Sequence, residues 1–247
     1  MIFVVTTCMG RLHHLKQTAP RVLADARFEY VLSDYGCPDQ SGSWMNRNHP
    51  RAHVVRTRAK VNASKFVFKK VEALNIGARK AIELGAEYLC FLDADTIVNP
   101  GFHDWVVENM SRDLFLICRC EFDEHPKTLE TAGFLCVHRD HYLAVGGFDE
   151  RMEGWGGDDM DLRAKLYMYQ GLSWRNIPLD LIDPISHDDA ARGKYYTVSK
   201  EHSGARNLDF VIENFKSWTG KYPAELIDTD VGRKFYELMG LDRKKSS

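Results

Sequence analysis

The sequence predicts an α/β fold in which a mixed, mostly parallel sheet is flanked by helices. Short apolar, β-branched runs alternate with stretches of helical periodicity through the first half of the chain, which is typical of repeated βα units. Connections of this kind make neighbouring strands parallel. The chain has 247 residues, of which 44% are hydrophobic and 28% are charged. This is enough for one well-cored domain with a smaller C-terminal portion.

The elements of the first half follow from this alternation. Pro20 must end or kink the first helix, because it lacks the N–H that a helix interior requires. Gly85 is placed as the stop of a long helix, and the Gly, Pro, Ser and Asn content of residues 34–50 predicts a long loop. The expected strands are 2–7, 28–33, 52–58, 88–92 and 114–119, and the expected helices are 12–25, 65–84 and 100–110.

Shorter elements are predicted in the second half. Gly146 and Gly147 break the chain after a short helix, because glycine adopts backbone conformations that other residues avoid. A polar stretch that contains glycine covers residues 187–206. The expected strands are 133–137 and 172–177, and the expected helices are 138–145, 158–170, 208–218 and 231–239.

Charge and cysteine content exclude several classes of function. The formal net charge is −2, so the chain lacks the basic character of a nucleic-acid binder, and we expect a small-molecule partner. Six cysteines lie mostly in apolar runs and lack zinc-site spacing, which predicts free thiols in a reducing compartment. No leader pattern or run of roughly twenty apolar residues is present. We therefore expect a cytoplasmic protein, for which peripheral membrane association through a partner stays open.

The first candidate site follows the apolar run 88–92. Asp93 and Asp95 flank Ala94, and side chains two positions apart in a strand point to the same side. Divalent cations such as Mg²⁺ prefer oxygen ligands, so these carboxylates and a diphosphate make a complete shell. Ligands of such sheets lie beyond the carboxyl ends of the strands. The alternative is an exposed acidic turn that caps the next helix.

The second candidate site is Trp155-Gly156-Gly157-Asp158-Asp159, at the start of a predicted helix. A tryptophan offers a flat face to a sugar ring, and the two glycines allow positive φ and close backbone approach. The helix dipole favours ionised carboxylates here, whereas crowding of acids raises a pKa toward that of a general base. A plain helix N-cap is the alternative, and it explains the acids but not the tryptophan.

His187 is a candidate metal ligand, because a site built from carboxylates and a diphosphate still has a vacancy. An imidazole in that position would favour Mn²⁺ over Mg²⁺. Asp188 and Asp189 are possible substitutes.

Three polar residues near predicted strand ends or on the long helix complete the candidates. Asn75 and Arg79 flank Gly77 on the helix expected at 65–84. A glycine allows close approach to a nucleotide and a cation suits its phosphates, although a solvated basic face is the alternative. Asp34 follows the second strand and is placed to accept a hydrogen bond from the N3–H of a uracil base, although aspartate is common in any turn.

Four segments of the sequence carry a resemblance to a known family. They are Thr6-Thr7-Cys8-Met9-Gly10-Arg11, Ala73-Leu74-Asn75-Ile76-Gly77, Phe91-Leu92-Asp93-Ala94-Asp95, and Gly146-Gly147-Phe148-Asp149-Glu150 running into Gly154-Trp155-Gly156-Gly157-Asp158-Asp159-Met160-Asp161. They resemble the GT-A fold glycosyltransferases, whose sheet is Rossmann-like and binds nucleotides. The branch is that of the β-1,4-galactosyltransferases, the polypeptide N-acetylgalactosaminyltransferases and the chondroitin polymerases. The resemblance spans roughly residues 1–190, and its last segment is the most specific.

The resemblance implies roles for most of these residues. Asp95 and His187 would bind a divalent metal, Mn²⁺ or Mg²⁺, with Asp93 beside them and near the ribose. Trp155, Gly156, Gly157 and Asp158 would contact the donor sugar or the acceptor. The residues expected to bind the nucleotide are Thr6, Thr7, Arg11, Asp34, Asn75, Arg79, Asp93 and Ala94.

The resemblance also implies a reaction. Asp159 falls where inverting galactosyltransferases have their base, while retaining relatives tend to have an amide there. We therefore expect inverting transfer of a hexose or N-acetylhexosamine from a UDP-sugar to a glycan, lipid-linked or protein acceptor. Galactose or N-acetylgalactosamine is favoured by the resemblance alone. Pro184 departs from the pattern, because the galactosyltransferases have a methionine ligand at that point.

Three alternatives stay open. The first is a retaining transferase on the same scaffold. A nucleotidyltransferase would use a similar acidic site, but the chain lacks a glycine-rich phosphate loop near its start. A non-catalytic sugar-binding module would use Trp155 as its platform. For the leading hypothesis we divide the single domain 1–247 into a nucleotide-sugar half (1–120), an acceptor and catalytic half (121–204) and C-terminal helices (205–247).

Overall fold

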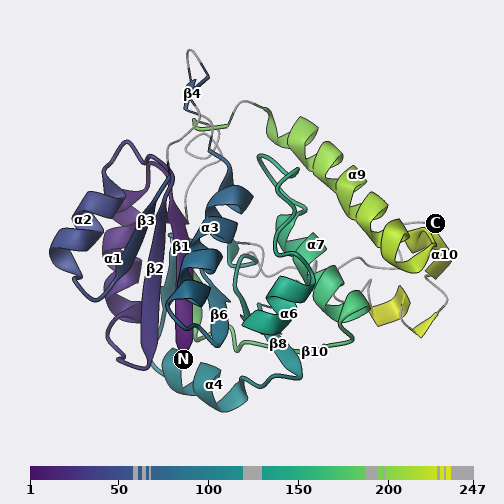
Figure 1. Ribbon diagram of the computed structural model, residues 1–247, viewed down its shortest axis with the longest axis horizontal. Coiled ribbons are helices and arrows are strands. Elements are labelled where there is room, and N and C mark those ends of the chain that lie inside the picture. Colours follow the sequence, from purple (N-terminus) through teal and green to yellow (C-terminus); the bar gives the residue numbers. More distant parts are fainter. Residues whose placement is uncertain are drawn as a thin grey trace.

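A seven-stranded sheet forms the centre of the computed structural model (Figure 1). Its strands are β1 (Ile2–Cys8), β2 (Phe28–Asp34), β3 (His53–Arg56), β6 (Tyr88–Phe91), β8 (Leu114–Ile117), β9 (Leu135–His138) and β10 (Ser173–Asn176). They lie in the order β10-β8-β9-β6-β1-β2-β3. Strand β9 is antiparallel to both of its neighbours, and the other adjacent pairs are parallel. The expected mixed, mostly parallel sheet is confirmed.

The structure describes residues 1–57, 61–62, 65–66, 68–118, 130–186, 194–196, 198–226, 229–230 and 232–234. The helix expected at 231–239 falls mostly outside these residues. Within them, no helix has the length and apolar character needed to cross a membrane. The cysteines in the described part are buried free thiols, as expected: Cys8, Cys37, Cys90, Cys118 and Cys136.

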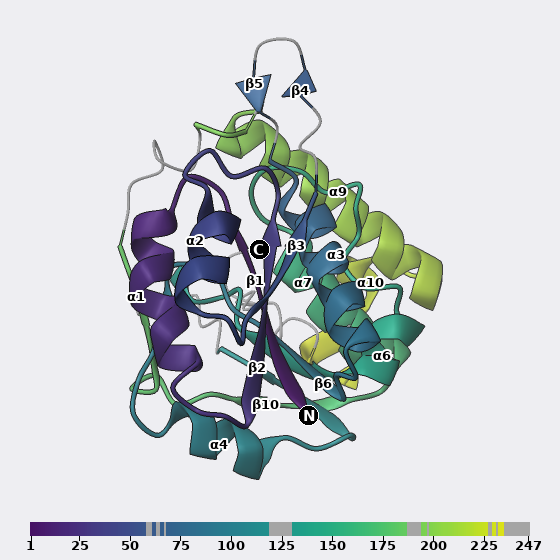
Figure 2. The same cartoon turned by 60° about the vertical axis from the view of Figure 1, so that its left-hand side comes forward.

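Alternating side chains of the strands fill two apolar layers. In β1, Ile2 and Val4 face one layer, while Phe3 and Val5 face the other, because side chains alternate along a strand. The view in Figure 2 shows helices on both sides of β1, β2 and β3. The first layer is covered by α1 (Leu12–Val22), α2 (Ser41–Asn48) and α4 (Phe102–Asn109), and the second by α3 (Lys70–Glu83), α6 (Arg139–Ala144) and α7 (Asp158–Ala164).

The C-terminal portion is built on α9 (Lys200–Thr219), which begins well before the expected 208–218. Its start is marked by Ser199, whose side chain accepts from the amide of His202, an N-cap that the polar composition concealed. Val211 and Phe215 pack with residues of α7 in a third apolar cluster, so α9 lies against α7. The short helix α10 (Pro223–Leu226) follows α9. Earlier in the chain, the helix expected at 158–170 is divided into α7 and a π-helical turn, η1 (Lys165–Tyr169).

The loop expected at 34–50 contains helix α2, which the sequence analysis missed. Its composition is poor in helix formers. The carboxylate of Asp34, at the end of β2, accepts from the amides of Cys37 at 2.9 Å and Gly42 at 3.2 Å. Gly42 lies in the first turn of α2, so a side chain from outside the helix satisfies an amide that has no partner within it.

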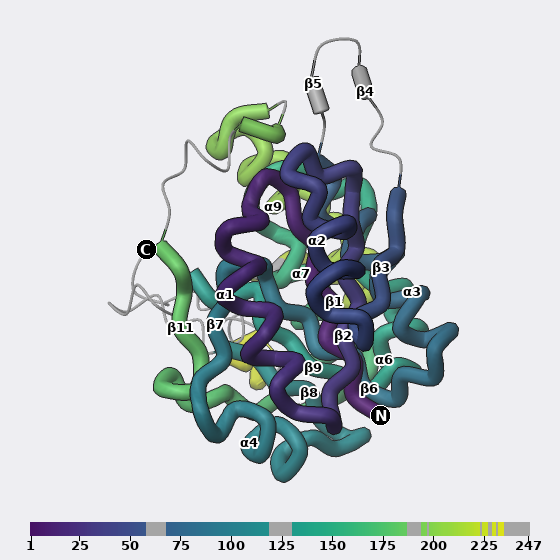
Figure 3. The backbone as a smooth tube through the Cα atoms, turned by 90° about the vertical axis from the view of Figure 1, so that its left-hand side faces the viewer, coloured from purple at the N-terminus to yellow at the C-terminus, as the bar shows by residue number. Residues whose placement is uncertain are grey.

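One helix boundary and one strand pair also differ from the prediction. The helix expected at 65–84 begins only at Lys70, because β5 (Lys65–Phe66) pairs with β4 (Val61–Asn62) instead. The short strands β7 (Thr96–Val98) and β11 (Ile182–Pro184) form an antiparallel pair that was not expected. Figure 3 shows them side by side next to α1. Pairing between three-residue strands so distant in sequence leaves no local pattern.

Asn75 anchors α3 to the turn that follows α6. Its side-chain amide donates to the carbonyl of Phe148 at 2.9 Å, and its carbonyl oxygen accepts from the Phe148 amide at 3.0 Å and from the Tyr142 hydroxyl at 2.5 Å. Nearby in α3, Gly77 packs against β1, where a Cβ on the glycine would come within 2.7 Å of the Val5 side chain. Asn75 therefore fixes α3 to this turn, and Gly77 allows the helix to lie close to the sheet.

Replacing Asn75 with alanine is expected to destabilise the fold. The change leaves the buried Phe148 amide and Tyr142 hydroxyl without their partner, and we expect a loss of about 3 kcal/mol, since each such group costs roughly 1–3 kcal/mol. Urea unfolding measures the free energy of unfolding. The control is Asn48→Ala, because the exposed Asn48 side chain makes a single bond, to the carbonyl of Trp44 within α2. Equal losses in both variants would contradict the anchoring role.

Candidate active site

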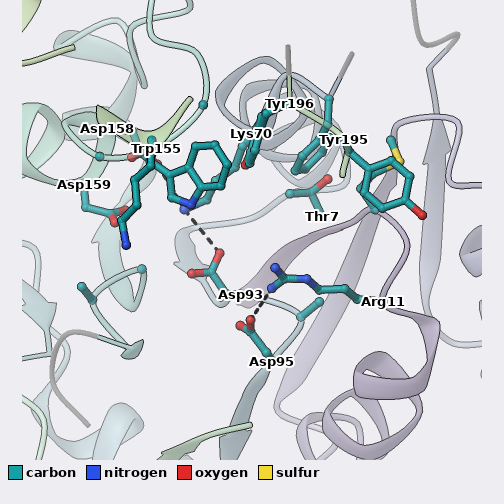
Figure 4. A pocket seen from close by; sticks show the side chains of 18 of the residues that line it. Thr7, Arg11, Lys70, Asp93, Asp95, Trp155, Asp158, Asp159, Tyr195 and Tyr196 are labelled. Carbon is teal, nitrogen blue, oxygen red and sulfur yellow. Dashed lines mark hydrogen bonds and ion pairs between the residues drawn. The ribbon is translucent and has the colours of Figure 1, made fainter. Parts of the chain in front are cut away.

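One pocket of about 610 Å³ receives both acidic clusters that the sequence predicts. It lies beyond the carboxyl ends of β1 and β6, where ligands of such sheets bind. Asp93 and Asp95 line it from one side, and Trp155, Asp158 and Asp159 line it from another (Figure 4). The expectation that these two segments face a common cleft is confirmed.

The turn after β6 places its carboxylates in the pocket. Asp95 is 5% exposed and accepts a bond of 2.5 Å from the guanidinium of Arg11, which comes from the loop between β1 and α1. Thr18 of α1 donates to the carbonyl of Ala94 at 3.0 Å. The turn is therefore held by α1 and is not the exposed acidic turn considered as an alternative.

Lys70, the first residue of α3, links the two acidic clusters. Its ammonium lies 3.4 Å from the carboxylate of Asp93 and 3.1 Å from that of Asp158. Burial opposes the charge, but these carboxylates outweigh it and hold the pKa of Lys70 well above its ordinary value. The Lys70 side chain is only 20% exposed, so this lysine belongs to the pocket and not to a solvated surface.

Three glycines shape the loop in front of α7. Gly154, Gly156 and Gly157 have φ values of 78°, 75° and 88°, a region that residues with a Cβ rarely adopt. Gly154 and Gly156 also line the pocket together with Trp155. The loop thereby brings the tryptophan and the start of α7 to the same cavity, as the sequence predicts.

The surroundings of Asp159 raise the pKa of its carboxyl group. Burial, followed by the charge of Asp158, raises the pKa of Asp159 to about 7, against the opposing charges of Lys70 and Arg163. A base is most effective when its pKa lies near the working pH. The expected effect of crowding among acids is therefore found at Asp159, at the second residue of α7.

Aromatic side chains that the sequence analysis did not single out also line the pocket. The centroid of the Tyr196 ring lies 4.5 Å from that of the Trp155 ring and 6.0 Å from that of the Phe68 ring. Tyr195 lines the pocket beside them, and its backbone carbonyl accepts from the amide of Phe68 at 3.0 Å. Burial raises the pKa of Tyr196 to about 12. Rings in this arrangement offer apolar faces suited to sugars.

Half of the residues expected to bind the nucleotide lie elsewhere in the described part of the chain. Thr7, Arg11, Asp93 and Ala94 line the pocket. The other four, which are not among the lining residues, are Thr6, Asp34, Asn75 and Arg79.

These four residues make contacts within the fold. Asn75 holds the turn at Phe148. Arg79 is 58% exposed and pairs with Glu150 at 3.8 Å. Thr6 is buried within β1 at 1% exposure. The carboxylate of Asp34 accepts from the amide of Cys37, which precedes α2, and from that of Gly42, in the first turn of α2. These four residues are not among those that line the pocket, and their role in binding the nucleotide stays a prediction.

The residues expected to bind a metal lie only partly within the described part of the chain. Asp93 and Asp95 lie together in the pocket, whereas His187 and its substitutes Asp188 and Asp189 lie outside the described residues. Over the described ranges no group of three or more His, Cys, Asp or Glu side chains comes together as a metal site. The amide of Ile185 donates to the carbonyl of Asp95 at 2.7 Å, so the segment that leads to His187 passes this turn.

Comparison with known proteins bears on the second half of the site. A family model described as the N-terminal domain of galactosyltransferase matches residues 117–189, which include Trp155 and α7. Human β-1,4-galactosyltransferase 4 is 27% identical over 126 residues, covering 45% of this chain and 33% of that protein. The match thus spans about a third of the length of this curated relative.

Solved structures with a similar fold cover most of the chain. The catalytic domain of Drosophila β1,4-galactosyltransferase 7, in complex with xylobiose, has a TM-score of 0.54 at 16% identity, covering 83% of this chain and 79% of that one. GalNAc-T7 with UDP, GalNAc and Mn²⁺ has a TM-score of 0.62 at 15% identity, covering 96% and 54%. Staphylococcus aureus TarS 1-349 with UDP-GlcNAc has a TM-score of 0.60 at 11% identity, covering 96% and 70%.

These comparisons agree with the geometry of the pocket. The fold is shared along nearly the whole chain, and the sequence match is concentrated where the tryptophan loop and the acidic helix start lie. The chain therefore has the fold of the GT-A glycosyltransferases, and its resemblance to the galactosyltransferases is confirmed.

Proposed function

We propose that this protein is a metal-dependent, inverting glycosyltransferase that moves a hexose or N-acetylhexosamine from a UDP-sugar to an acceptor hydroxyl. The observation that carries the proposal is the common pocket of the Asp93–Asp95 turn and the Trp155–Asp159 segment. Similar folds bind UDP, GalNAc and Mn²⁺ in GalNAc-T7 and UDP-GlcNAc in TarS. Galactose and N-acetylgalactosamine are the favoured donors through the galactosyltransferase match.

The donor is expected to lie along the carboxyl ends of β1 and β6. Thr7, Arg11 and Ala94 line this side, and the guanidinium of Arg11 suits a diphosphate because it presents several donors in a fixed plane. On the opposite side, Trp155 and Tyr196 offer ring faces to the donor sugar or to an acceptor sugar. This arrangement fits a glycan acceptor, and lipid-linked or protein acceptors stay open.

The carboxylates of Asp93 and Asp95 fit a hard divalent cation, because both supply oxygen donors at one corner of the pocket. Each is already paired with positive charge, Asp95 with Arg11 and Asp93 with Lys70. We assign these two residues as ligands, with His187 as the further ligand and Asp188 or Asp189 as its alternatives. A bound Mn²⁺ or Mg²⁺ supplies positive charge to the departing UDP.

Asp159 is assigned as the base. With a pKa of about 7, its carboxylate accepts the proton of the acceptor hydroxyl at neutral pH. The hydroxyl oxygen then forms a bond to the anomeric carbon while the bond from that carbon to the UDP oxygen breaks. Asp158, held by Lys70 at 3.1 Å, is placed to accept from hydroxyls of the sugar or the acceptor.

The proposed function is tested by screening UDP-sugars for Mn²⁺-dependent transfer and hydrolysis. Release of UDP with an inverted product anomer supports the proposal. Retained anomeric configuration identifies a retaining transferase, and release of pyrophosphate identifies a nucleotidyltransferase. Binding of sugars without turnover of any donor identifies a non-catalytic module, and each of these three results overturns the proposal.

The pH dependence of kcat should follow the protonation of Asp159. A base works as its carboxylate, so kcat is expected to rise with pH through about 7 and then level off. Asp159→Asn should remove this limb and lower kcat about 100-fold or more, the range of general base catalysis. The control is Asp104→Asn, a 67% exposed position on α4. An unchanged limb in Asp159→Asn would exclude Asp159 as the base.

Removing the positive charge of Lys70 should move the same limb. Lys70 lowers the pKa of Asp159 against the stronger effects of burial and Asp158, so Lys70→Met is expected to shift the acid limb of kcat to higher pH. Lys80→Met, on the same helix but 38% exposed and paired with Glu83, is the matched control. A limb that stays in place would show that Lys70 does not act on the base.

Asp95→Ala is expected to remove the response to metal. With its carboxylate gone, the oxygen shell offered to the cation is incomplete, so stimulation of UDP-sugar hydrolysis by Mn²⁺ should be lost. Mn²⁺ binding, followed by electron paramagnetic resonance, gives a second readout that does not need turnover. Wild-type Mn²⁺ binding and stimulation in the variant would show that the metal assignment is wrong.

A further inference from the structure

Helix α9 packs against the loop that carries Trp155 and is hydrogen-bonded to its backbone. The galactosyltransferase model ends at residue 189, whereas α9 spans Lys200–Thr219, so the support comes from outside the matched segment. The first turns of α9 also reach the pocket itself, where Lys200 and Gly204 line it. One face of α9 therefore meets both the cavity and the back of the tryptophan loop.

Asn207 makes most of this contact. It is 1% exposed, and its side-chain nitrogen lies within hydrogen-bond distance of three carbonyl oxygens, those of Glu153 at 3.0 Å, Trp155 at 3.2 Å and Gly156 at 2.7 Å. Its side-chain oxygen accepts from the amide of Glu153 at 3.3 Å. One buried side chain thus binds the backbone of the loop on both sides of the tryptophan.

Ser203, one turn earlier on α9, holds the remaining backbone group. Its hydroxyl accepts from the amide of Trp155 at 3.1 Å and donates to the carbonyl of Ser199 at 2.9 Å. The packing is close, because a Cβ on Gly154 would lie 2.7 Å from Ser203 and a Cβ on Gly157 would lie 2.9 Å from Asn207. The amide and carbonyl of Trp155 are both bonded to α9.

A glycine-rich loop needs such support. Gly154, Gly156 and Gly157 have access to more backbone conformations than other residues, and ordering them costs conformational entropy. An asparagine side chain donates and accepts at once, so it can bind carbonyl and amide groups of one loop together. An aspartate of the same shape presents only acceptors when ionised, and its oxygens would face the loop carbonyls.

We propose that Asn207 is a positioning residue, which acts through the backbone of residues 153–156 to hold Trp155 and the start of α7 in place for sugar transfer. Gly157 is the N-cap of α7, so the loop that Asn207 holds leads directly into Asp158 and Asp159. The consequence for turnover rests on the proposed function, while the consequence for the order of the loop does not.

Hydrogen exchange followed by mass spectrometry tests the effect on the loop without any substrate. In Asn207→Asp, amides of residues 153–158 should exchange about tenfold faster or more, which corresponds to a local opening made easier by about 1.4 kcal/mol. Peptides from β1, β2 and α3 should keep wild-type rates. Asn48→Asp on α2, where the exposed amide makes a single bond to Trp44, is the matched control and should leave the loop unchanged.

Steady-state kinetics and UDP binding test the effect on the reaction. Because small displacements of reacting groups cost up to about 100-fold in rate, Asn207→Asp should lower kcat by about tenfold to 100-fold. The dissociation constant of UDP, measured by calorimetry with Mn²⁺ present, should change less than about threefold, since the expected donor residues Thr7, Arg11, Asp93 and Asp95 lie on the other side of the pocket.

The hydrogen-exchange and kinetic experiments together distinguish a failure of this proposal from a failure of the proposed function. If the wild-type protein turns over no UDP-sugar, the function fails, and the exchange rates still decide whether Asn207 orders the loop. If Asn207→Asp folds with wild-type exchange in residues 153–158, the positioning role is overturned. If this variant does not fold, Asn207→Ala, which removes the same side-chain bonds to the loop without adding a charge, should give faster exchange in residues 153–158. Wild-type exchange in that variant also overturns the proposal.

Discussion

The pocket depends on one ammonium group between two sets of carboxylates. Lys70 pairs with both Asp93 and Asp158, and its positive charge offsets the repulsion between their carboxylates. The two ion pairs therefore join the start of α3 to the turn after β6 and to the start of α7. Asp159 shares this field, which partly offsets the effects of burial and of Asp158 on its pKa.

The parts of the site that were predictable from sequence are those with a local signature. Asp93 and Asp95 follow a short apolar run, and parallel strands bring such ends to one edge of a sheet. The glycines before Asp158 indicate a tight turn, and acids after them indicate a helix start. In each case a few adjacent residues determine both conformation and direction, so the position of the acidic clusters in the fold could be inferred without coordinates.

The parts that were not predictable depend on partners distant in sequence. Asn75 is bonded to Phe148 in the turn after α6, and Asp34 is bonded to the amides of Cys37 and Gly42; none of these contacts can be read from the sequence. Lys70 directly follows Lys69, and the sequence does not show whether either side chain is buried or exposed. The same limit hid α2 and the pairing of β7 with β11, since tertiary contacts override weak local propensity.

The support of the tryptophan loop by α9 has a consequence for biosynthesis. The chain emerges from the ribosome from its N-terminus, and domains begin to fold as they appear. A nascent chain that has exposed the central sheet and both acidic clusters still lacks Ser203 and Asn207, whose bonds fix the backbone at Trp155. The backbone of this loop is therefore fixed only once α9 has been synthesised, so a nascent chain that lacks α9 would carry both acidic clusters without these bonds to Trp155.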